Sequence, residues 1–186
     1  DGDVWDGRTK ARVVPPRTQI VLGFDGSDVD DWTGIRAETQ DGYQFTPETP
    51  MGPTIWNPAD HGGRVPRLEV AAAVDWIFTK FDVVRMYCDP PYWETEVDTW
   101  AERYGEKRVL RWETYRPKQM HDACERILTD VAKKDSSFTH DGCPITAAHI
   151  RNTRKAARAA GSVPRYVLTK PGDGRKIDLA VCSVLV

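Results

Sequence analysis

The sequence predicts an α/β fold in which helices cover both faces of one mixed central sheet. Three observations lead to this prediction. The first is a run of three short segments with strand character, separated by turns, near the beginning of the chain. The second is the alternation of helical and apolar extended segments that follows. The third is the length of 186 residues, which suits one domain with a proper core better than two domains.

The three segments near the beginning predict an antiparallel meander. Its strands are expected at Thr18–Phe24, Trp32–Thr39 and Tyr43–Thr46. Asp25-Gly26 follows the first strand, and Asp41-Gly42 separates the second strand from the third. Asp-Gly is a favoured turn pair. The next segment, residues 47–66, is rich in proline and glycine, so we expect a loop there.

Helices and single strands alternate through the rest of the chain. Apolar residues at helical spacing predict helices at Pro66–Phe81, Glu94–Tyr104, Pro117–Lys134, Thr146–Ala160 and 177–186. Extended segments are expected between them, at 83–89, 108–113, 138–143 and 165–170. A three-strand meander that crosses into parallel strands is the ribonuclease H-like arrangement, so this is the fold class that the sequence predicts.

Composition narrows the class of protein. With 40% hydrophobic and 29% charged residues, the chain resembles an ordinary globular domain. The net charge is −2, so a polyanionic partner would need a local basic patch. No apolar run approaches the roughly 18–20 residues of a membrane span, and we expect no membrane association. The cysteines Cys88, Cys124, Cys143 and Cys182 form no C-x-x-C pair, which favours reduced thiols over a zinc site.

Three carboxylates fall at the ends of elements that this fold brings together. Asp25 ends the first strand, and Asp89 ends the strand at 83–89. Since these two strands are expected to be parallel neighbours, both carboxylates should lie at one edge of the sheet. Asp178 starts the last helix, whose apolar face must pack on the sheet. Such a group suits two divalent ions, Mg²⁺ or Mn²⁺, about 3.5–4 Å apart for phosphodiester cleavage.

Each of these acids also has a structural explanation. Asp25 can start an Asp-Gly turn, Asp89 can cap the turn before two prolines, and Asp178 can be a helix N-cap. For any one of them alone, the structural explanation is the commoner one. The coincidence of all three at positions that this fold would use favours a shared site.

Other metal and phosphate motifs fail their tests. The acids at 28–31 do not form a calcium loop, because Trp32 and Thr33 stand where an oxygen ligand and glycine are required. The segment Gly172–Lys176 lacks the spacing of a phosphate loop, so we expect no ATP site. The histidines show no paired spacing for zinc and are expected at the surface or in loops; they are His61, His121, His140 and His149.

A group of basic residues is predicted to line one face of the helix at Thr146–Ala160. Its members, at i, i+3, i+4 and i+7, are Arg151, Arg154, Lys155 and Arg158. A solvated face is the default explanation. All four charges have one sign, however, and binding of DNA phosphates would relieve their repulsion. A second basic group precedes Asp178 and is expected to flank the same cleft: Lys170, Arg175 and Lys176. Phosphate contacts of this kind provide little sequence readout.

Five stretches of the chain carry a family resemblance: LGFDGSDVDDWTGI, VPRLEVAAAVDWI, MYCDPPYWETEVDTWAERYG, HDGCPITAAHIRNTRKAA and KIDLAVCSVLV. Together they resemble the C-terminal nuclease domain of the phage terminase large subunit, particularly in phages that infect actinobacteria. They occur in family order and span nearly the whole chain. The resemblance implies a ribonuclease H-like endonuclease that cuts double-stranded DNA with two divalent ions.

The resemblance also implies residue roles, partners and a setting. Asp25, Asp89 and Asp178 match the catalytic acids of the family, and Asp31 or Asp28 matches a further acid found in some members. The implied partners are DNA, an N-terminal ATPase domain, the portal and the small terminase subunit, in the cytoplasm of the infected bacterial host. Residues 1–13 are then a linker from the ATPase domain, and residues 14–186 are the nuclease domain. We expect the isolated domain to be monomeric.

Two other functions remain open from the sequence. One is a ribonuclease H-like nuclease of the resolvase or transposase kind, which would prefer branched DNA to linear duplex. The other is a DNA-docking module whose acids are structural. Such a module would bind DNA without cutting it, and metal would not change its melting temperature.

Overall fold

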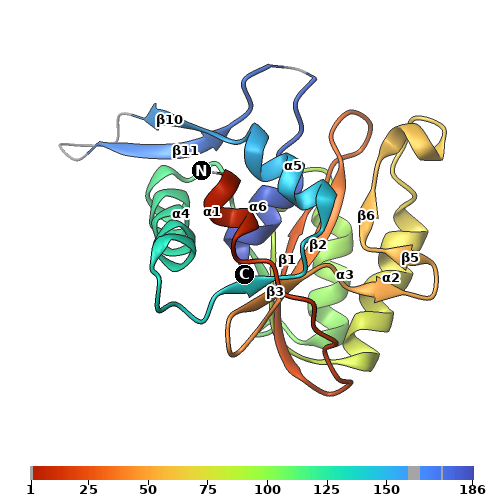
Figure 1. Cartoon of the computed structure of the whole chain (residues 1–186). Helices are drawn as coiled ribbons and strands as arrows, with labels where there is room; N and C mark the ends of the chain where they lie inside the picture. The colour runs from red at the N-terminus through yellow and green to blue at the C-terminus, as the bar shows by residue number, and fades with distance from the viewer. Residues whose placement is uncertain (1, 159–163, 173) are drawn as a thin grey trace.

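The structure, a computed structural model, describes residues 2–158, 164–172 and 174–186 (Figure 1). Its main feature is a seven-stranded sheet with the strand order β8-β7-β1-β2-β3-β9, in which β6 also pairs with β2. The strands are β1 (Gln19–Asp25), β2 (Thr33–Thr39), β3 (Tyr43–Phe45), β6 (Ile55–Trp56), β7 (Asp82–Cys88), β8 (Val109–Arg111) and β9 (Thr139–His140).

Strand directions confirm the predicted ribonuclease H-like fold. β1, β2 and β3 form an antiparallel meander, in which Asp25 lies opposite Gly34. β1 is also parallel to β7, with Phe24 opposite Cys88, and β7 is parallel to β8. The carboxyl ends of β1 and β7 therefore meet at one edge of the sheet.

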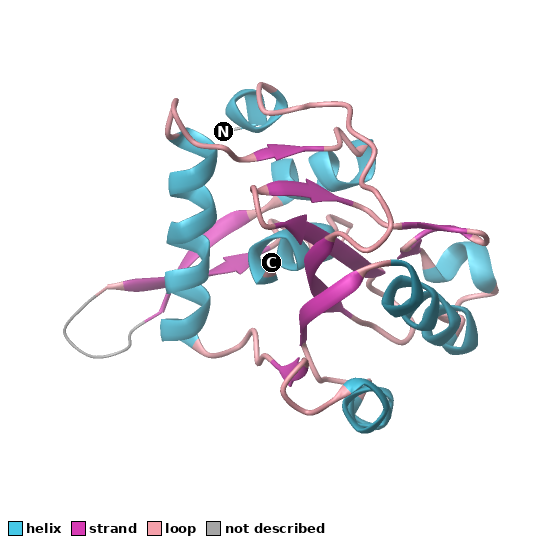
Figure 2. Ribbon diagram, turned by 90° about the horizontal axis from the view of Figure 1, so that it is seen from below, coloured by secondary structure: helices cyan, strands magenta, loops and turns pink. Residues whose placement is uncertain are grey.

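Helices cover both faces of the sheet, as predicted. They are α1 (Gly2–Asp6), α2 (Arg67–Lys80), α3 (Glu94–Tyr104), α4 (Pro117–Ala132), α5 (Pro144–Asn152) and α6 (Asp178–Leu185). Figures 1 and 2 show α2 and α3 on one side of the sheet and α4, α5 and α6 on the other. Each side has its own apolar core: Val74 and Trp100 belong to the first, and Met120 and Val184 to the second. None of the helices in the described ranges is both long and apolar enough to cross a membrane.

Two glycines let α6 pack closely on the middle of the sheet. A Cβ atom on Gly23 of β1 would lie 2.4 Å from the carbonyl oxygen of Cys182, and one on Gly34 of β2 would lie 2.7 Å from Leu179 Cδ1. Any larger residue at either position would push the helix away from the sheet. Because Asp178 is the first residue of α6, this close contact also sets how near Asp178 lies to the end of β1.

The structure differs from expectation at the beginning of the chain and in the proline-rich segment. Residues 2–6, within the expected linker, form α1, whose Trp5 is buried and stacks on His140 with 4.2 Å between ring centroids. Residues 47–66 contain β6, the short strands β4 (Glu48–Thr49) and β5 (Gly52–Pro53), and a 3-10 turn at Pro58–His61. Elements this short have no periodicity from which a sequence could predict them.

The prediction of a helix over Thr146–Ala160 is wrong for residues 153–158, and its last two residues, 159 and 160, lie outside the described residues. α5 ends at Asn152, and Arg154–Arg158 forms β10, which pairs with β11 (Arg165–Thr169) in an antiparallel ladder. Ala, Arg and Lys favour helices, but the centre of β11 (166–168) is Tyr-Val-Leu, which favours a strand. Pairing with β11 satisfies the backbone of β10, so this tertiary contact overrides the local helix propensity.

Candidate active site

Asp25 and Asp89 lie side by side at the ends of two paired strands. Asp25 is the last residue of β1, and Asp89 directly follows β7. The N–H of Asp89 donates to the carbonyl oxygen of Phe24 at 3.0 Å, so the backbone pairing continues as far as these two acids. The carboxylate of Asp89 accepts hydrogen bonds from Thr114, from the N–H at 3.2 Å and from Oγ1 at 2.6 Å. Its orientation is therefore fixed.

Asp178 reaches the same place from the other side. It begins α6 and is 7% exposed. The backbone N–H of Trp32 is hydrogen-bonded to its carboxylate, but Oδ2 is buried and has no hydrogen-bond partner among the described residues. A buried carboxylate oxygen without a partner is costly unless a ligand completes it.

One cleft of about 370 Å³ contains the predicted acids. Its lining includes Asp25, Asp31, Asp89 and Asp178, together with Thr114 and Lys170. Asp28, the alternative to Asp31, instead lies 3.2 Å from Arg64 Nη2 and 3.4 Å from Arg67 Nη2, and it does not line the cleft. The structure thus brings together three acids from segments far apart in the sequence and favours Asp31 as the fourth.

Burial raises the pKa values of three of the acids, and neighbouring carboxylates of the cleft add to the shift for Asp25 and Asp178. Burial raises the pKa of Asp25 well above its usual value, and the nearby carboxylates of Asp178, Asp89 and Asp31 add to the shift. Burial likewise raises the pKa of Asp178 to about 6 and outweighs the hydrogen bonds that oppose it. The pKa of Asp89 is raised by burial against the bonds from Thr114. The cleft holds more negative charge than its own cations neutralise, which suits a cation ligand.

Asp31 is the exception, because two lysines neutralise it. Lys170 Nζ lies 2.9 Å and Lys176 Nζ 2.7 Å from Asp31 Oδ1. Partial burial works to raise the pKa of Asp31, but the hydrogen bonds from Lys176 and Lys170 outweigh it and leave that pKa lowered. Lys176 Nζ also donates to the carbonyl oxygen of Asp30 at 2.7 Å. Of the second predicted basic group, Lys170 lines the cleft and Lys176 reaches its Asp31, whereas the guanidinium of Arg175 donates to Asn152 Oδ1 at 3.3 Å and does not line the cleft.

The donor set of the cleft fits a hard divalent cation. The acidic residues that line it are all aspartates, whose carboxylate oxygens are the ligands that Mg²⁺ and Mn²⁺ prefer. Among the described residues, Asp178 Oδ2 has no hydrogen-bond partner, so it can bind a cation. Within the described ranges, no three His, Cys, Asp or Glu side chains are gathered closely enough to hold a metal ion as they stand. A cation bound among the carboxylates would reduce their mutual repulsion.

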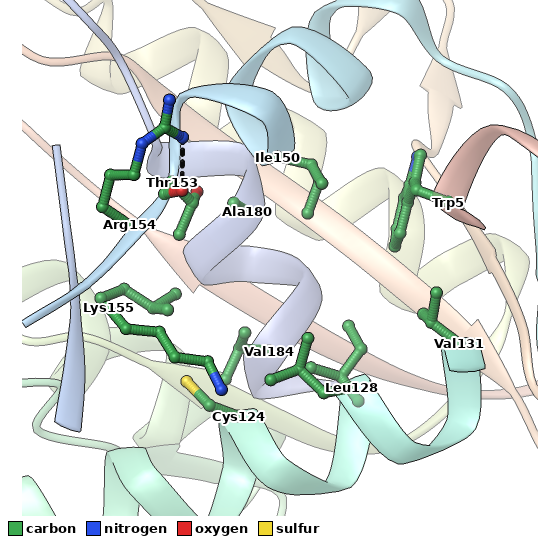
Figure 3. A pocket seen from close by; sticks show the side chains of 12 residues that line it. Trp5, Cys124, Leu128, Val131, Ile150, Thr153, Arg154, Lys155, Ala180 and Val184 are labelled. Carbon is green, nitrogen blue, oxygen red and sulfur yellow. Dashed lines mark hydrogen bonds between the residues drawn. The ribbon is translucent and has the colours of Figure 1, made fainter. Parts of the chain in front are cut away.

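The predicted basic face does not exist, because its residues belong to different elements. Arg151 lies in the last turn of α5 and pairs with Asp6 of α1. Figure 3 shows the other two described side chains beside a second hollow, of about 210 Å³, between α4, α6 and β10. Arg154 turns back to the carbonyl oxygens of Arg151 and Thr153, at 2.7 and 2.9 Å. Lys155 extends toward α4, where its Nζ lies 3.6 Å from Glu125 Oε1. Arg158 lies in β10, and its side chain is outside the described residues.

Sequence reasoning missed the residues that support the acids. Thr114 and the lysine pairs with Asp31 have no local signal, because they join positions 25, 139 and 145 residues apart. The expectation that the histidines lie at the surface or in loops is wrong for two of them: His140 and His149 are 1% and 4% exposed. His149 shares the buried face of α5 with Thr146 at i, i+3 spacing, and this pattern was a usable signal.

No family model matches the chain. It is 33% identical over 177 residues to the Gene 13 protein of Mycobacterium phage D29 and 32% identical over 177 residues to the Gene 13 protein of Mycobacterium phage L5. Each match covers 90% of this chain and 28% of the relative. The chain thus spans about 28% of the length of these curated relatives.

Solved structures of phage large terminases share the fold. The HK97 bacteriophage large terminase matches with a TM-score of 0.74 and 17% identity, over 100% of this chain and 42% of that one. The large terminase nuclease from thermophilic phage G20c matches at 0.69 and 12%, over 98% of this chain and 95% of that one. The same nuclease with bound magnesium matches with a TM-score of 0.65 and 13% identity, over 98% of this chain and 94% of that one. The resemblance found in the sequence is thereby confirmed at the level of the fold.

Proposed function

We propose that this chain is the nuclease domain of a phage DNA-packaging motor, and that it cuts concatemeric double-stranded DNA by metal-dependent hydrolysis with little sequence preference. The carrying observation is the single cleft lined by Asp25, Asp31, Asp89 and Asp178 at the carboxyl ends of β1 and β7. Support comes from the fold shared with phage large terminases and from the relatives in mycobacteriophages. The magnesium in one of those structures supports a divalent cofactor.

In this proposal, Asp25, Asp89 and Asp178 hold two divalent ions, Mg²⁺ or Mn²⁺, with Asp31 as a further ligand. Ions bound there would lower the pKa of a water and neutralise charge on the phosphate. Thr114 keeps the Asp89 carboxylate in place. Lys170 and Lys176, which pair with Asp31, would be released from it by a bound cation and would then be close enough to bind DNA phosphates beside the cleft.

The rest of the packaging motor is part of the same proposal. An N-terminal ATPase domain, connected through residues 1–13, would supply DNA movement, while the portal and the small terminase subunit would position the motor in the host cytoplasm. The domain described here would cut DNA but not translocate it. The docking-module alternative is disfavoured because Asp178 Oδ2 is buried without a hydrogen-bond partner among the described residues, which a purely structural role does not require.

Incubation of supercoiled plasmid with the domain in Mg²⁺, Mn²⁺ and EDTA tests this function. We expect nicking and linearisation in metal, and none in EDTA or with Asp178→Asn. The loss in that variant should exceed the roughly 10–100-fold typical of residues that only orient ligands. Asp98→Asn is the matched control, because its carboxylate is 61% exposed and pairs with Arg111 on the surface.

The same experiment separates the alternatives. Cutting by Asp178→Asn at the wild-type rate would refute the proposed site. DNA binding without cutting, together with no effect of metal on the melting temperature, would favour the docking module. A strong preference for a four-way junction over linear duplex would favour the resolvase alternative.

A further inference from the structure

The first turn of α6 has no cap from its own segment. The N-cap residue is Ile177, which makes no side-chain hydrogen bond to the turn. The N–H groups of Ala180 and Val181 donate to the carbonyl oxygen of Ile177 at 2.8 and 3.0 Å. The N–H of Leu179 is one of the groups that a helix leaves without an internal acceptor. Such a group is destabilising if it stays buried and unpaired.

His149 of α5 supplies the missing acceptor. The N–H of Leu179 donates to His149 Nδ1 at 3.1 Å. The imidazole side chain is 5% exposed, and its ring lies edge-on to Trp32 with 5.3 Å between centroids. It is therefore fixed between α5, α6 and the residue that follows Asp31. Through Leu179, it also fixes the backbone next to Asp178.

The direction of this hydrogen bond decides what Asp178 can bind. Because Nδ1 of His149 accepts, the proton of the neutral ring is on Nε2. Nδ1 lies 3.9 Å from Asp178 Oδ2, the buried oxygen that has no partner among the described residues. A protonated Nδ1 would lose the bond from Leu179 and would be attracted to that carboxylate oxygen. An acceptor there leaves the oxygen free.

We propose that His149 is a positioning residue for the metal site: it caps α6 as an acceptor and so holds Asp178 with Oδ2 free for a cation. This inference rests on the proposed function, since only a metal-binding role needs that oxygen free. It goes further by assigning part of the metal affinity to a residue that lines neither the cleft nor any surface.

Variants at position 149 can separate the acceptor from the packing. His149→Leu fills about the same space with an apolar side chain and removes the acceptor. His149→Asn restores it, because the Asn Oδ1 atom is attached where Nδ1 is attached in His. His149→Gln retains an amide but moves its oxygen one carbon further from the backbone. The readout is the affinity for Mn²⁺ by titration calorimetry, with melting temperature measured separately in EDTA.

His140→Leu is the matched control. His140 is also a buried histidine whose Nδ1 accepts a backbone N–H, from Gly142 at 3.0 Å, and whose ring stacks on a tryptophan. It lies in β9 and does not line the acidic cleft. His140→Leu should lower the melting temperature, because it leaves the buried N–H of Gly142 without an acceptor, but it should not affect Asp178.

We expect His149→Leu to weaken Mn²⁺ binding about 10–100-fold, the range for residues that orient metal ligands. His149→Asn should bind Mn²⁺ nearly as the wild type does, and His140→Leu should keep wild-type affinity despite its lower melting temperature. Unchanged affinity in a folded His149→Leu would overturn the inference and leave the proposed function standing.

The remaining outcomes are also decisive. If His149→Leu does not fold, the amide pair decides: weaker binding by His149→Gln than by His149→Asn supports the inference, and equal binding overturns it. A wild-type domain that binds neither Mn²⁺ nor Mg²⁺ would instead overturn the proposed metal site, and the role of His149 with it.

Discussion

The two walls of the acidic cleft are held in different ways. The strand wall consists of the ends of β1 and β7 with Asp25 and Asp89, and the parallel ladder, which is regular from Val21 to Phe24, fixes it. The helix wall consists of the start of α6 with Asp178, the preceding Lys176, and Lys170 after β11. Packing of α6 on the sheet at Gly23 and Gly34 holds the helix itself, and single polar contacts hold its first turn and the lysines: the His149 cap and the lysine pairs with Asp31. Disturbing one contact should therefore affect the helix wall more than the strand wall.

The walls also differ in charge. In the cleft, the strand wall contributes Asp25 and Asp89, which have no cation partner in the described chain, whereas the helix wall brings Lys170 and Lys176. These lysines bind Asp31, which follows β1, and so connect the two walls. The relative position of the walls thus depends on the same charges that a metal ion or DNA would change.

The largest expected effect is on the pH dependence of stability, and it sharpens the comparison at Asp178. The pKa of Asp178 is raised by burial to about 6, above its ordinary 3.8, so the folded metal-free domain binds this proton more tightly than the unfolded chain. The associated stabilisation is complete below about pH 4 and is lost as the pH rises through about 6, an effect on the order of 1–3 kcal/mol.

Urea unfolding in EDTA at several pH values measures this effect. Asp178→Asn cannot ionise, so above pH 6 it should be more stable than the wild type, and the difference should shrink toward pH 4. Asp98→Asn should follow the wild-type curve. Parallel curves for Asp178→Asn and the wild type would contradict the raised pKa.

The next effect concerns the strand wall, where Arg67 connects the segments that follow β1 and β7. Its guanidinium donates to Glu96 Oε1 at 2.8 Å and to the carbonyl oxygen of Tyr92 at 2.7 Å, and it lies 4.4 Å from the ring centroid of Trp93. Tyr92 has a φ of 67°, a strained value for a residue other than glycine, so the bond to its carbonyl matters.

We expect Arg67→Met to lower the free energy of unfolding by about 1–2 kcal/mol, because it removes these hydrogen bonds and the cation–π contact. Arg64→Met is the control: Arg64 is 75% exposed, and its pair with Asp28 should contribute less than about 0.5 kcal/mol. Chemical denaturation of both variants checks the difference. Equal losses would show that Arg67 has no special role in this wall.

The same contrast explains what the sequence could predict. The strand wall follows from local signals: apolar runs that end on Asp25 and Asp89, and prolines that stop the second run. Asp178 was found in the same way, at the start of an apolar helix. The segment at 153–158 was not, because Ala-rich helix propensity there yields to pairing with β11. Contacts such as Leu179 with His149 join residues 30 apart and leave no periodic pattern.

The smallest expected effect tests which cations bind DNA. Lys170 reaches the cleft, whereas Arg154, from the basic face that the sequence predicted, donates to nearby backbone carbonyls beside a different hollow. Lys170→Met should weaken duplex binding a few-fold and lower the slope of log affinity against log salt by about 0.9, the value for one lost phosphate contact.

Arg154→Met should leave that slope unchanged. Fluorescence anisotropy with a short duplex between 50 and 200 mM salt, roughly the range over which such contacts are resolved, measures both variants. The binding is best measured in Ca²⁺ with Asp178→Asn as the background, so that cutting does not interfere. If Arg154→Met lowered the slope and Lys170→Met left it unchanged, the DNA would lie along β10 instead of the helix wall. The two walls would then differ in stability alone.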